Sequence, residues 1–388
     1  MNPRAFIIGI LLLAIVPLAR AADAPPPAAK TVRVAAVQAR SRVIDFRLKP
    51  AEALAAVDRN LADLEAIIHR AAQDKCDVLC FPEDTPGLLN WTGGNPASLK
   101  EVLPEAVKRM TQRLGRAAAS HHMRLVICAD NLEEDGSLYN TAFFLDREGK
   151  EVGRYRKVCP TWHEGRKRGT SFPVFPTPDL GNVGMLICYD LVFPETARCL
   201  ALQGADVIFF PTMGTAAIAD GDDDIGVQAL RVRAVENFVW LVVAHRGAGA
   251  MIISPQGKIV ARASGPDGIA AADIDPRGGR AGGDAMNAQS DMRARLFRER
   301  NPAAFGILTD PDPPALKSIP IDITAEEASR ISARVLTTGE QEFKAASTLA
   351  AQDKTQEAIQ AFTRLRQDYH GSWIDRVSAQ RLAELQAR

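Results

Sequence analysis

Short apolar runs typical of strands alternate along most of this chain with longer segments of helical periodicity. The first half shows these patterns in the order strand 32–37, helix 54–68, strand 77–81, helix 99–119, strand 124–129 and a hairpin of strands 139–145 and 151–156. The second half repeats the alternation with strand 183–187, helix 195–203, strand 206–210, helix 225–237, strand 239–244 and short strands around 254–257. Two similar halves predict two stacked mixed sheets with helices outside, which is a four-layer α-β-β-α sandwich of the α/β class.

The size and charge of the chain narrow its possible functions. Its 388 residues are enough for one large domain with a small appendage, or for two domains. Lys and Arg together number 47 and Asp and Glu together also number 47. A chain without net charge is not expected to be a dedicated nucleic-acid binder.

The N-terminus has the pattern of a secretory signal peptide. Arg4 precedes the apolar run 5–16, and Ala19 and Ala21 occupy the small-residue positions of a cleavage site. The run is too short to span a bilayer comfortably, so a retained membrane anchor is the less favoured alternative. We expect a signal peptide over 1–21, a Pro/Ala-rich spacer over 22–30 and an exported protein, periplasmic or extracellular.

Export would place the cysteines in an oxidising compartment. The sequence has six, at positions 76, 80, 128, 159, 188 and 199. This is too few for a disulfide scaffold in a chain of this length, and their pairing cannot be read from the sequence. Cys76 and Cys80 are spaced like half of a zinc site, but no second Cys or His pair at ligand spacing follows, so no metal is expected.

Three predicted strands end next to chemically reactive side chains. Glu83 follows one strand in Phe-Pro-Glu, Lys157 another in Tyr-Arg-Lys, and Cys188 a third in Ile-Cys-Tyr. Strand ends at one edge of a sheet converge, so a carboxylate, an ammonium and a thiol are expected to meet there. A thiol beside free backbone N–H groups can be held as a thiolate and can have its product oxyanion stabilised. Taken singly, each residue has a simpler interpretation as a buried cysteine or a solvated charge.

Together these segments resemble the three signatures of the nitrilase superfamily, the carbon-nitrogen hydrolases. The third signature is Ile187-Cys-Tyr-Asp-Leu-Val-Phe-Pro-Glu195. The resemblance extends over residues 31–312, including the stretches 37–38, 203–206, 233–237 and 295–305. It implies a catalytic trio in which Cys188 attacks the carbonyl carbon, Glu83 acts as general base and acid, and Lys157 stabilises the oxyanion together with the Tyr189 backbone N–H.

The resemblance also implies supporting residues. Glu164 fits the second glutamate of the family, which would hydrogen-bond Lys157 or orient the leaving group, although the spacer between the two is compact. Glu195 would support the site by hydrogen-bonding loop amides from the helix after the nucleophile. The basic run 166–168 is a candidate contact for an anionic substrate, with a solvated loop as the alternative.

The implied activity is hydrolysis of a non-peptide C–N bond of a small amide or N-carbamoyl compound, without metal or organic cofactor. Nitrile hydrolysis and N-acyl transfer to an amine use the same kind of site and remain alternatives. A helical-repeat binding protein with a vestigial enzyme domain is a further alternative, and a Cys-His protease has little support. The resemblance also implies a homodimer that forms through the outer helices.

The composition changes after Asp310, where Pro-Asp-Pro-Pro314 indicates a linker. We expect a linker over 313–338 and a helical tail over 339–388. The stretch 354–365 resembles a helix of a tetratricopeptide repeat, and Ser372 is placed to cap the helix after it. Because a single repeat with one further helix buries its apolar face poorly, we expect the tail to pack on the main domain or on a protein partner.

Overall fold

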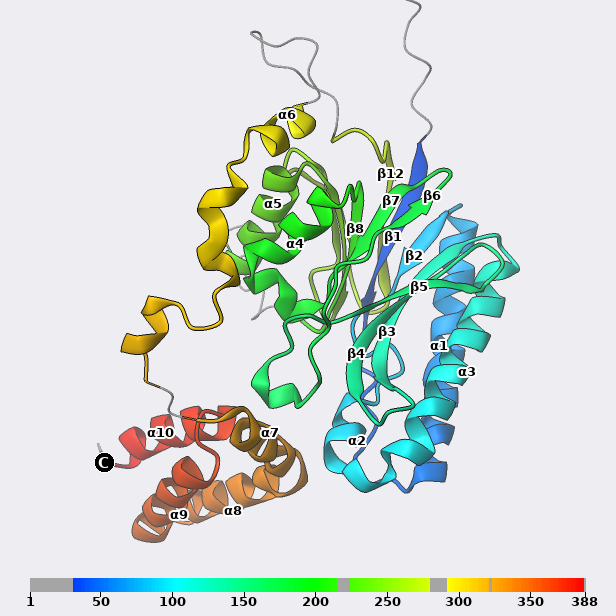
Figure 1. The fold of residues 1–388 in the computed structure, drawn as a ribbon. Helices are drawn as coiled ribbons and strands as arrows, with labels where there is room; N and C mark the ends of the chain where they lie inside the picture. Colours follow the sequence, from blue (N-terminus) through cyan, green and yellow to red (C-terminus); the bar gives the residue numbers. More distant parts are fainter. Residues whose placement is uncertain (1–30, 215–223, 280–291, 321–322, 387–388) are drawn as a thin grey trace, which may run out of the picture. The chain divides into compact units, whose positions relative to one another are not determined.

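The computed structural model describes residues 31–214, 224–279, 292–320 and 323–386 (Figure 1). The expected signal peptide and spacer, 1–21 and 22–30, lie outside these residues. Among the described residues, no helix is both long and apolar enough to cross a membrane.

The first half follows the expected alternation closely. Its elements are β1 (Val32–Ala39), α1 (Pro50–Gln73), β2 (Val78–Cys80), α2 (Leu89–Gly94), α3 (Leu99–Ala119), β3 (Arg124–Leu132), β4 (Leu138–Leu145) and β5 (Glu151–Arg156). Helix α1 is amphipathic, and Val57, Leu61 and Leu64 on its inner face are buried. The sequence pattern did not predict the short helix α2.

The second half also matches the expected order and adds two strands. Its elements are β6 (Phe175–Thr177), β7 (Gly181–Met185), α4 (Pro194–Leu202), β8 (Val207–Thr212), α5 (Ile225–Asn237), β9 (Trp240–Arg246), β10 (Met251–Ile253), β11 (Ile259–Arg262), β12 (Gly268–Ile274) and α6 (Met292–Glu299). Strand β12 was not predicted, because its Gly-Ile-Ala-Ala-Ala sequence has little strand character. It forms by pairing antiparallel with β1 from Val32 to Gln38.

Hydrogen bonds join the strands of both halves into one sheet. Among the described residues, the order is β5-β4-β3-β2-β1-β9-β8-β7-β6, with β12 on β1 and β10 between β9 and β11. The halves meet where Gln38 and Ala39 pair with His245 and Arg246, and the Gly247 N–H donates to the Ala39 carbonyl over 2.8 Å. The two sheets expected from sequence are therefore continuous at this point, because β1 and β9 run parallel and their ends lie within hydrogen-bonding reach.

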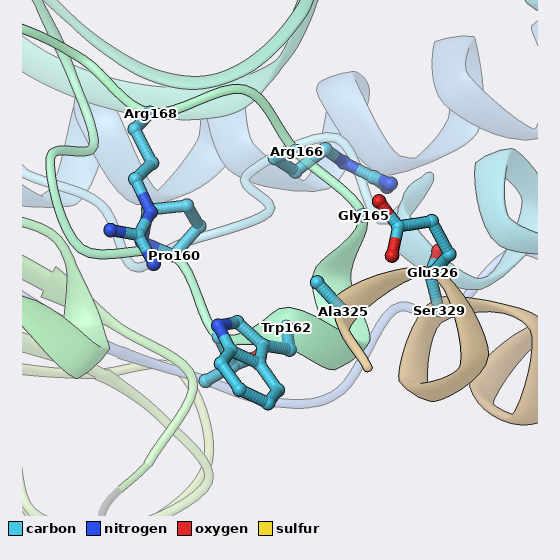
Figure 2. Close-up of a pocket in the computed structure, with 9 residues that line it drawn as sticks. Pro160, Trp162, Gly165, Arg166, Arg168, Ala325, Glu326 and Ser329 are labelled. Carbon is cyan, nitrogen blue, oxygen red and sulfur yellow. The ribbon is translucent and has the colours of Figure 1, made fainter. Parts of the chain in front are cut away.

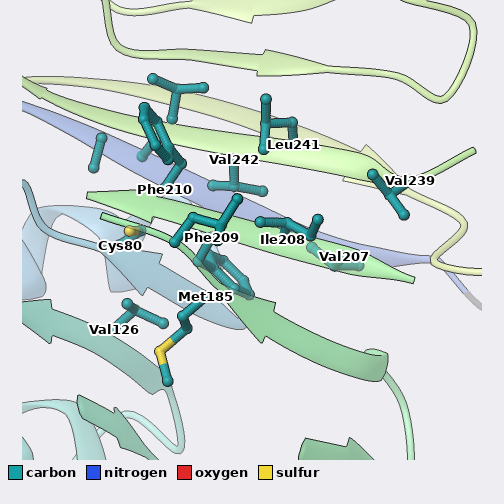
Figure 3. Close-up of a cluster of buried hydrophobic side chains, with 14 of the residues drawn as sticks. Cys80, Val126, Met185, Val207, Ile208, Phe209, Phe210, Val239, Leu241 and Val242 are labelled. Carbon is teal, nitrogen blue, oxygen red and sulfur yellow. The ribbon is translucent and has the colours of Figure 1, made fainter. Parts of the chain in front are cut away.

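Strands β1, β2 and β3 of the first half are buried on both faces. Along β1, Val34 and Ala36 belong to a core cluster that also contains residues of β7, β8 and β9. The alternate residues Ala35 and Val37 belong to a cluster with α1 and α3. In Figure 3, Val126 lies near Met185 within the first cluster. In Figure 1, α1 and α3 flank the strands on one side and α4 and α5 on the other.

Helical structure in the tail begins at Ala325, earlier than expected. The tail contains α7 (Ala325–Arg334), a π-helical turn (Val335–Gly339), α8 (Glu340–Ala351), α9 (Thr355–Asp368) and α10 (Trp373–Gln386). The expected linker 313–338 thus includes a whole helix, which the sequence pattern missed because α7 buries few side chains. The predicted cap is confirmed, since Ser372 Oγ accepts hydrogen bonds from the Ile374 and Asp375 N–H groups.

Candidate active site

The ends of β2 and β5 bring Glu83 and Lys157 together in a buried pair. Lys157 Nζ lies 3.0 Å from Glu83 Oε1, and both side chains are almost inaccessible to solvent. Asn140 Nδ2 donates to the same carboxylate oxygen over 2.7 Å, and the Met213 N–H donates to Glu83 Oε2 over 3.2 Å. Both carboxylate oxygens of Glu83 are therefore held in place by hydrogen bonds from three elements.

Cys188 begins a short 3₁₀ turn that follows β7. Its φ of 45° lies in the left-handed region, which a non-glycine residue rarely adopts. Such strain is common at functional sites. Burial, assisted by the charge of Glu83, raises the pKa of the Cys188 thiol to about 12, against the opposing effects of Lys157, Thr212 and Met213. The resting group is therefore a thiol, and it needs a base, which is the role expected of Glu83.

Lys157 lies between two carboxylates. Its Nζ is 3.0 Å from Glu83 and 2.8 Å from Glu164. Burial by itself lowers the pKa of Lys157, but the charges of these two carboxylates outweigh burial and raise it above the usual lysine value. Lys157 thus stays a cation, as an oxyanion-stabilising group must.

Glu164 reaches Lys157 from a 3₁₀ turn, Trp162–Glu164. The Thr161 N–H donates to Glu164 Oε1 over 3.0 Å and fixes the carboxylate next to the lysine. Glu164 Oε2 has a 3.5 Å contact with Asn140 Nδ2. The compact spacer after Lys157 is therefore compatible with the expected contact between the two residues.

Sequence reasoning missed a buried network that holds the nucleophile's turn. Asp190 accepts hydrogen bonds from the Ile187 N–H over 2.9 Å, the Tyr155 hydroxyl over 2.8 Å and the Cys159 N–H over 2.9 Å. Burial raises the pKa of Asp190. These bonds tie the Cys188 turn to the end of β5, which carries Lys157. The sequence signal that could have indicated this network was an aspartate within an otherwise apolar run, two residues after the candidate nucleophile.

The two expected supporting residues differ in what the structure says of them. The Tyr189 side chain is 38% exposed and packs edge-on against Phe193, and the role predicted for Tyr189, which belongs to its backbone N–H, stays a prediction. Glu195 is exposed in the first turn of α4. Among the described residues it makes no hydrogen bond to loop amides, so the bonds expected for it are absent because the side chain points into solvent.

The basic run after Glu164 does not form one anion site. Arg166 forms a buried ion pair with Asp130 at 2.6 Å and donates to Thr92 over 3.0 Å. Lys167 lies on the surface, 3.0 Å from Ser137. Because neighbouring polar groups engage both residues, the structure gives no support to the less favoured hypothesis of an anionic-substrate contact at Arg166 and Lys167, and the exposed Lys167 fits a solvated loop. Arg168, the last residue of the run, is exposed and lines a cavity.

The Glu164 loop faces the tail. A cavity of about 460 Å³ lies between them, lined by the loop residues Trp162 and Arg168 and by Ala325, Glu326 and Ser329 of the tail. Figure 2 shows these side chains on either side of the gap, with α7 opposite Gly165. The tail thus contributes side chains to a cavity whose other wall is the loop that carries Glu164.

The sequence of the α/β domain matches a known family model. The model described as carbon-nitrogen hydrolase covers residues 33–281. The chain belongs to this family. A deaminated glutathione amidase of Synechocystis sp. is 30% identical over 241 residues, which are 56% of this chain and 86% of the relative. A 2-oxoglutaramate amidase of Bacillus subtilis is 28% identical over 229 residues, with 56% and 84% covered.

Solved structures show the same fold. An amidase from Nesterenkonia sp. AN1, solved with the acetamide moiety of fluoroacetamide on its active-site cysteine, has a TM-score of 0.54. It is 23% identical, and the match covers 71% of this chain and 98% of that chain. The α/β domain therefore has the fold of this family, and the tail lies beyond the residues that the family model matches.

Proposed function

We propose that this protein hydrolyses a non-peptide C–N bond of a small amide or N-carbamoyl compound through a thioester on Cys188. The observation that carries this proposal is the buried lysine, whose Nζ lies within 3.0 Å of the Glu83 and Glu164 carboxylates at the strand edge that also carries Cys188. A fixed carboxylate base, a permanent cation and a protonated thiol are the groups that acyl transfer requires.

The first half-reaction forms the thioester. Glu83 takes the proton of the Cys188 thiol as sulfur bonds to the carbonyl carbon. Lys157 and the Tyr189 N–H stabilise the oxyanion, and each such donor is worth about 3 kcal/mol. The intermediate collapses, the C–N bond breaks, and Glu83 passes its proton to the departing nitrogen. The products are an amine or ammonia and an acyl-enzyme.

The second half-reaction uses water. Glu83, again a carboxylate, takes a proton from water as its oxygen attacks the thioester carbonyl. The C–S bond breaks, the acid leaves, and the proton on Glu83 returns to the Cys188 sulfur. Atoms and protons balance with no cofactor in either half-reaction.

The choice of substrate class is supported by the relatives. Two are named deaminated glutathione amidase and 2-oxoglutaramate amidase, and a third, from Solanum tuberosum, is named N-carbamoylputrescine amidase and is 29% identical over 201 residues. Another, from Pyrococcus abyssi, is named a nitrilase and is 32% identical over 226 residues. Nitrile hydrolysis thus remains the second candidate. Acyl transfer would differ from both, because mass spectrometry would show an N-acylated acceptor and not the free acid.

Removal of the Cys188 sulfur should abolish turnover. We expect Cys188→Ala to lose at least about a thousandfold in kcat/KM, because no other group in the site can form the acyl bond. Ammonia and acid release from a panel of amides, N-carbamoyl compounds and nitriles measures this. Cys199→Ala, in α4, is the matched control and should retain activity. Amide hydrolysis by Cys188→Ala at the parent rate would contradict the mechanism.

Five features of the wider molecule remain proposals. The four-layer arrangement is supported by the alternation of β1 side chains between two core clusters. Export is supported by the pattern of residues 1–21, and sequencing the N-terminus of the secreted protein tests it.

The repeat-like tail is supported by its separate core, which includes Phe362, Tyr369 and Ile374. Its possible protein partner and the homodimer rest on family resemblance and on exposed apolar residues.

A further inference from the structure

A second cavity, of about 590 Å³, lies beside Glu164. Its walls come from α2, from the first residues of α3 and β4, from the Glu164 loop, and from α7, the π-helical turn and the start of α10 in the tail. The apolar part of the lining includes Leu89, Leu99, Leu138, Leu336 and Trp373, and the polar part includes His163, Arg166 and Arg330. Within the described part of the chain, Glu164 is the only member of the proposed catalytic set that lines it. The cavity therefore adjoins the proposed active site at Glu164.

Close contacts position the wall supplied by the tail. A Cβ added at Gly165, the residue after Glu164, would lie 2.4 Å from Ser329 Oγ of α7. A Cβ added at Gly93 in α2 would lie 3.0 Å from Leu336 Cδ1. Glycine at both positions allows the tail to lie directly on the loop and on α2. The tail wall is thus packed against the hydrolase domain at two places.

The hydrogen bonds of Glu164 indicate which part of a substrate faces this cavity. Its Oε1 already accepts from Lys157 and from the Thr161 N–H, whereas the contact of Oε2 within the described ranges is the 3.5 Å one with Asn140. An ionised carboxylate only accepts hydrogen bonds, so Oε2 suits an amide N–H and repels a carbonyl oxygen. With the carbonyl oxygen at Lys157, the nitrogen faces Glu164, and a group on that nitrogen extends toward the cavity.

We propose that this cavity binds the apolar substituent on the nitrogen of an N-substituted amide or carbamoyl compound, and that the tail is a specificity element of the site. The assignment rests on the proposed function. A volume of about 590 Å³ is within the range of ligand pockets and holds a butyl or phenethyl group. Glu164 receives the N–H, and the leucines and Trp373 cover the apolar part.

Alkyl isocyanates test this geometry without turnover. The Cys188 sulfur adds to the isocyanate carbon and the thiol proton moves to nitrogen, which leaves a thiocarbamate with the N-substituent in the proposed position. Rates of Cys188 modification by ethyl, butyl and phenethyl isocyanate are followed by intact-protein mass spectrometry and peptide mapping, with Cys188→Ala as the blank. In the parent protein, we expect the rate to increase about threefold for each added buried methylene group.

Filling the cavity from the tail should remove this preference. Ala333 lines the cavity, and Ala333→Phe should slow modification by phenethyl isocyanate by about tenfold while changing the ethyl rate less than about twofold. Ala345→Phe, on the exposed face of α8, is the matched control and should leave both rates unchanged. Leu336→Ala, which enlarges the cavity without adding bulk, should shift the preference toward the largest reagent.

The outcomes separate this inference from the proposed function. Equal effects of Ala333→Phe on small and large reagents, or an unchanged preference in both cavity variants, would overturn the subsite. So would a parent protein in which Cys188 reacts with none of the isocyanates. If the size preference behaves as expected but no amide, carbamoyl compound or nitrile releases product, the proposed hydrolysis fails while the subsite stands.

Discussion

At the scale of single residues, the site depends on how burial changes the chemistry of a few side chains. Cys188 is partly buried and Lys157 is fully buried, and burial raises the pKa of the thiol but by itself lowers the pKa of the lysine. It keeps the thiol protonated, with a pKa of about 12, whereas two adjacent carboxylates keep the lysine charged. Strand ends in the sequence predicted that these groups meet. The pKa shift of the Cys188 thiol depends on burial and on neighbours such as Thr212 and Met213, whose contacts with it could not be predicted from the sequence.

The high thiol pKa gives a pH-dependent prediction for the base. In Glu83→Gln, catalysis should fall by about 10²–10⁴-fold near neutral pH, since the general base is lost. The remaining reaction needs a thiolate. Burial still raises the pKa of the thiol in this variant, although the raising effect of the Glu83 charge is lost, so the rate should rise with pH between 7 and 10, by up to about tenfold per pH unit. Initial rates of product release across this range measure the slope.

The exposed Glu134 provides a control for this test. Glu134→Gln should keep the activity and the pH profile of the parent, because its side chain lies on the surface after β3. A Glu83→Gln enzyme with parent-like activity at pH 7, or with a flat profile up to pH 10, would show that another group removes the thiol proton.

At the scale of elements, periodicity and caps predicted most helices and strands, while short elements escaped. The predicted bounds of α3 agree with the structure, and the Ser372 cap begins α10. Strand β12 and helix α2 were missed because small residues or few residues carry little periodic signal. Helix α7 was missed as well, and its contact with the Glu164 loop exists only in the folded chain.

The contact between α7 and Gly165 can be tested directly. In Gly165→Ala, the φ of 62° costs about 1 kcal/mol, and the new Cβ would lie too close to Ser329. We expect α7 to move off the loop, with faster amide hydrogen exchange in α7 and a higher KM, while exchange in α3 stays unchanged. Gly136→Ala has a similar φ of 80° with no atom within 4 Å, so it reproduces the strain without the collision.

The double variant Gly165→Ala/Ser329→Gly completes this test. Removal of the serine side chain should return α7 exchange toward the parent rate and leave only the strain that Gly136→Ala shares. If Gly136→Ala disturbs α7 as strongly as Gly165→Ala, the direct contact is not what holds the tail on the loop.

At the scale of the whole molecule, the distribution of apolar side chains supports the proposed homodimer. Helix α5 exposes Val232 and Val235, which are 49% and 44% accessible, and the neighbouring helix α4 exposes Leu202. Exposed apolar groups that gather on neighbouring elements are typical of an interface. The outer helices were the expected dimer surface.

A charge on this surface should dissociate the dimer. We expect Val235→Arg to raise the dimer dissociation constant by at least about tenfold, because a buried unpaired charge costs well over 1 kcal/mol. Sedimentation velocity over a range of protein concentrations measures the change. Val152→Arg, at a similarly exposed position on β5, should leave the oligomeric state as in the parent. Dissociation by both substitutions, or by neither, would place the interface elsewhere.

The sequence by itself determined the order of the elements and the reactive trio, because strand ends and helix faces are local patterns. It also indicated the family, through three short signatures at those strand ends. Only the tertiary structure decided that β1 and β9 join the two halves and that Arg166 forms an ion pair with Asp130. It also decided that burial raises the pKa of the Cys188 thiol. It also placed the tail beside Glu164. These features depend on groups far apart in the chain, whose burial and distances exist only after folding.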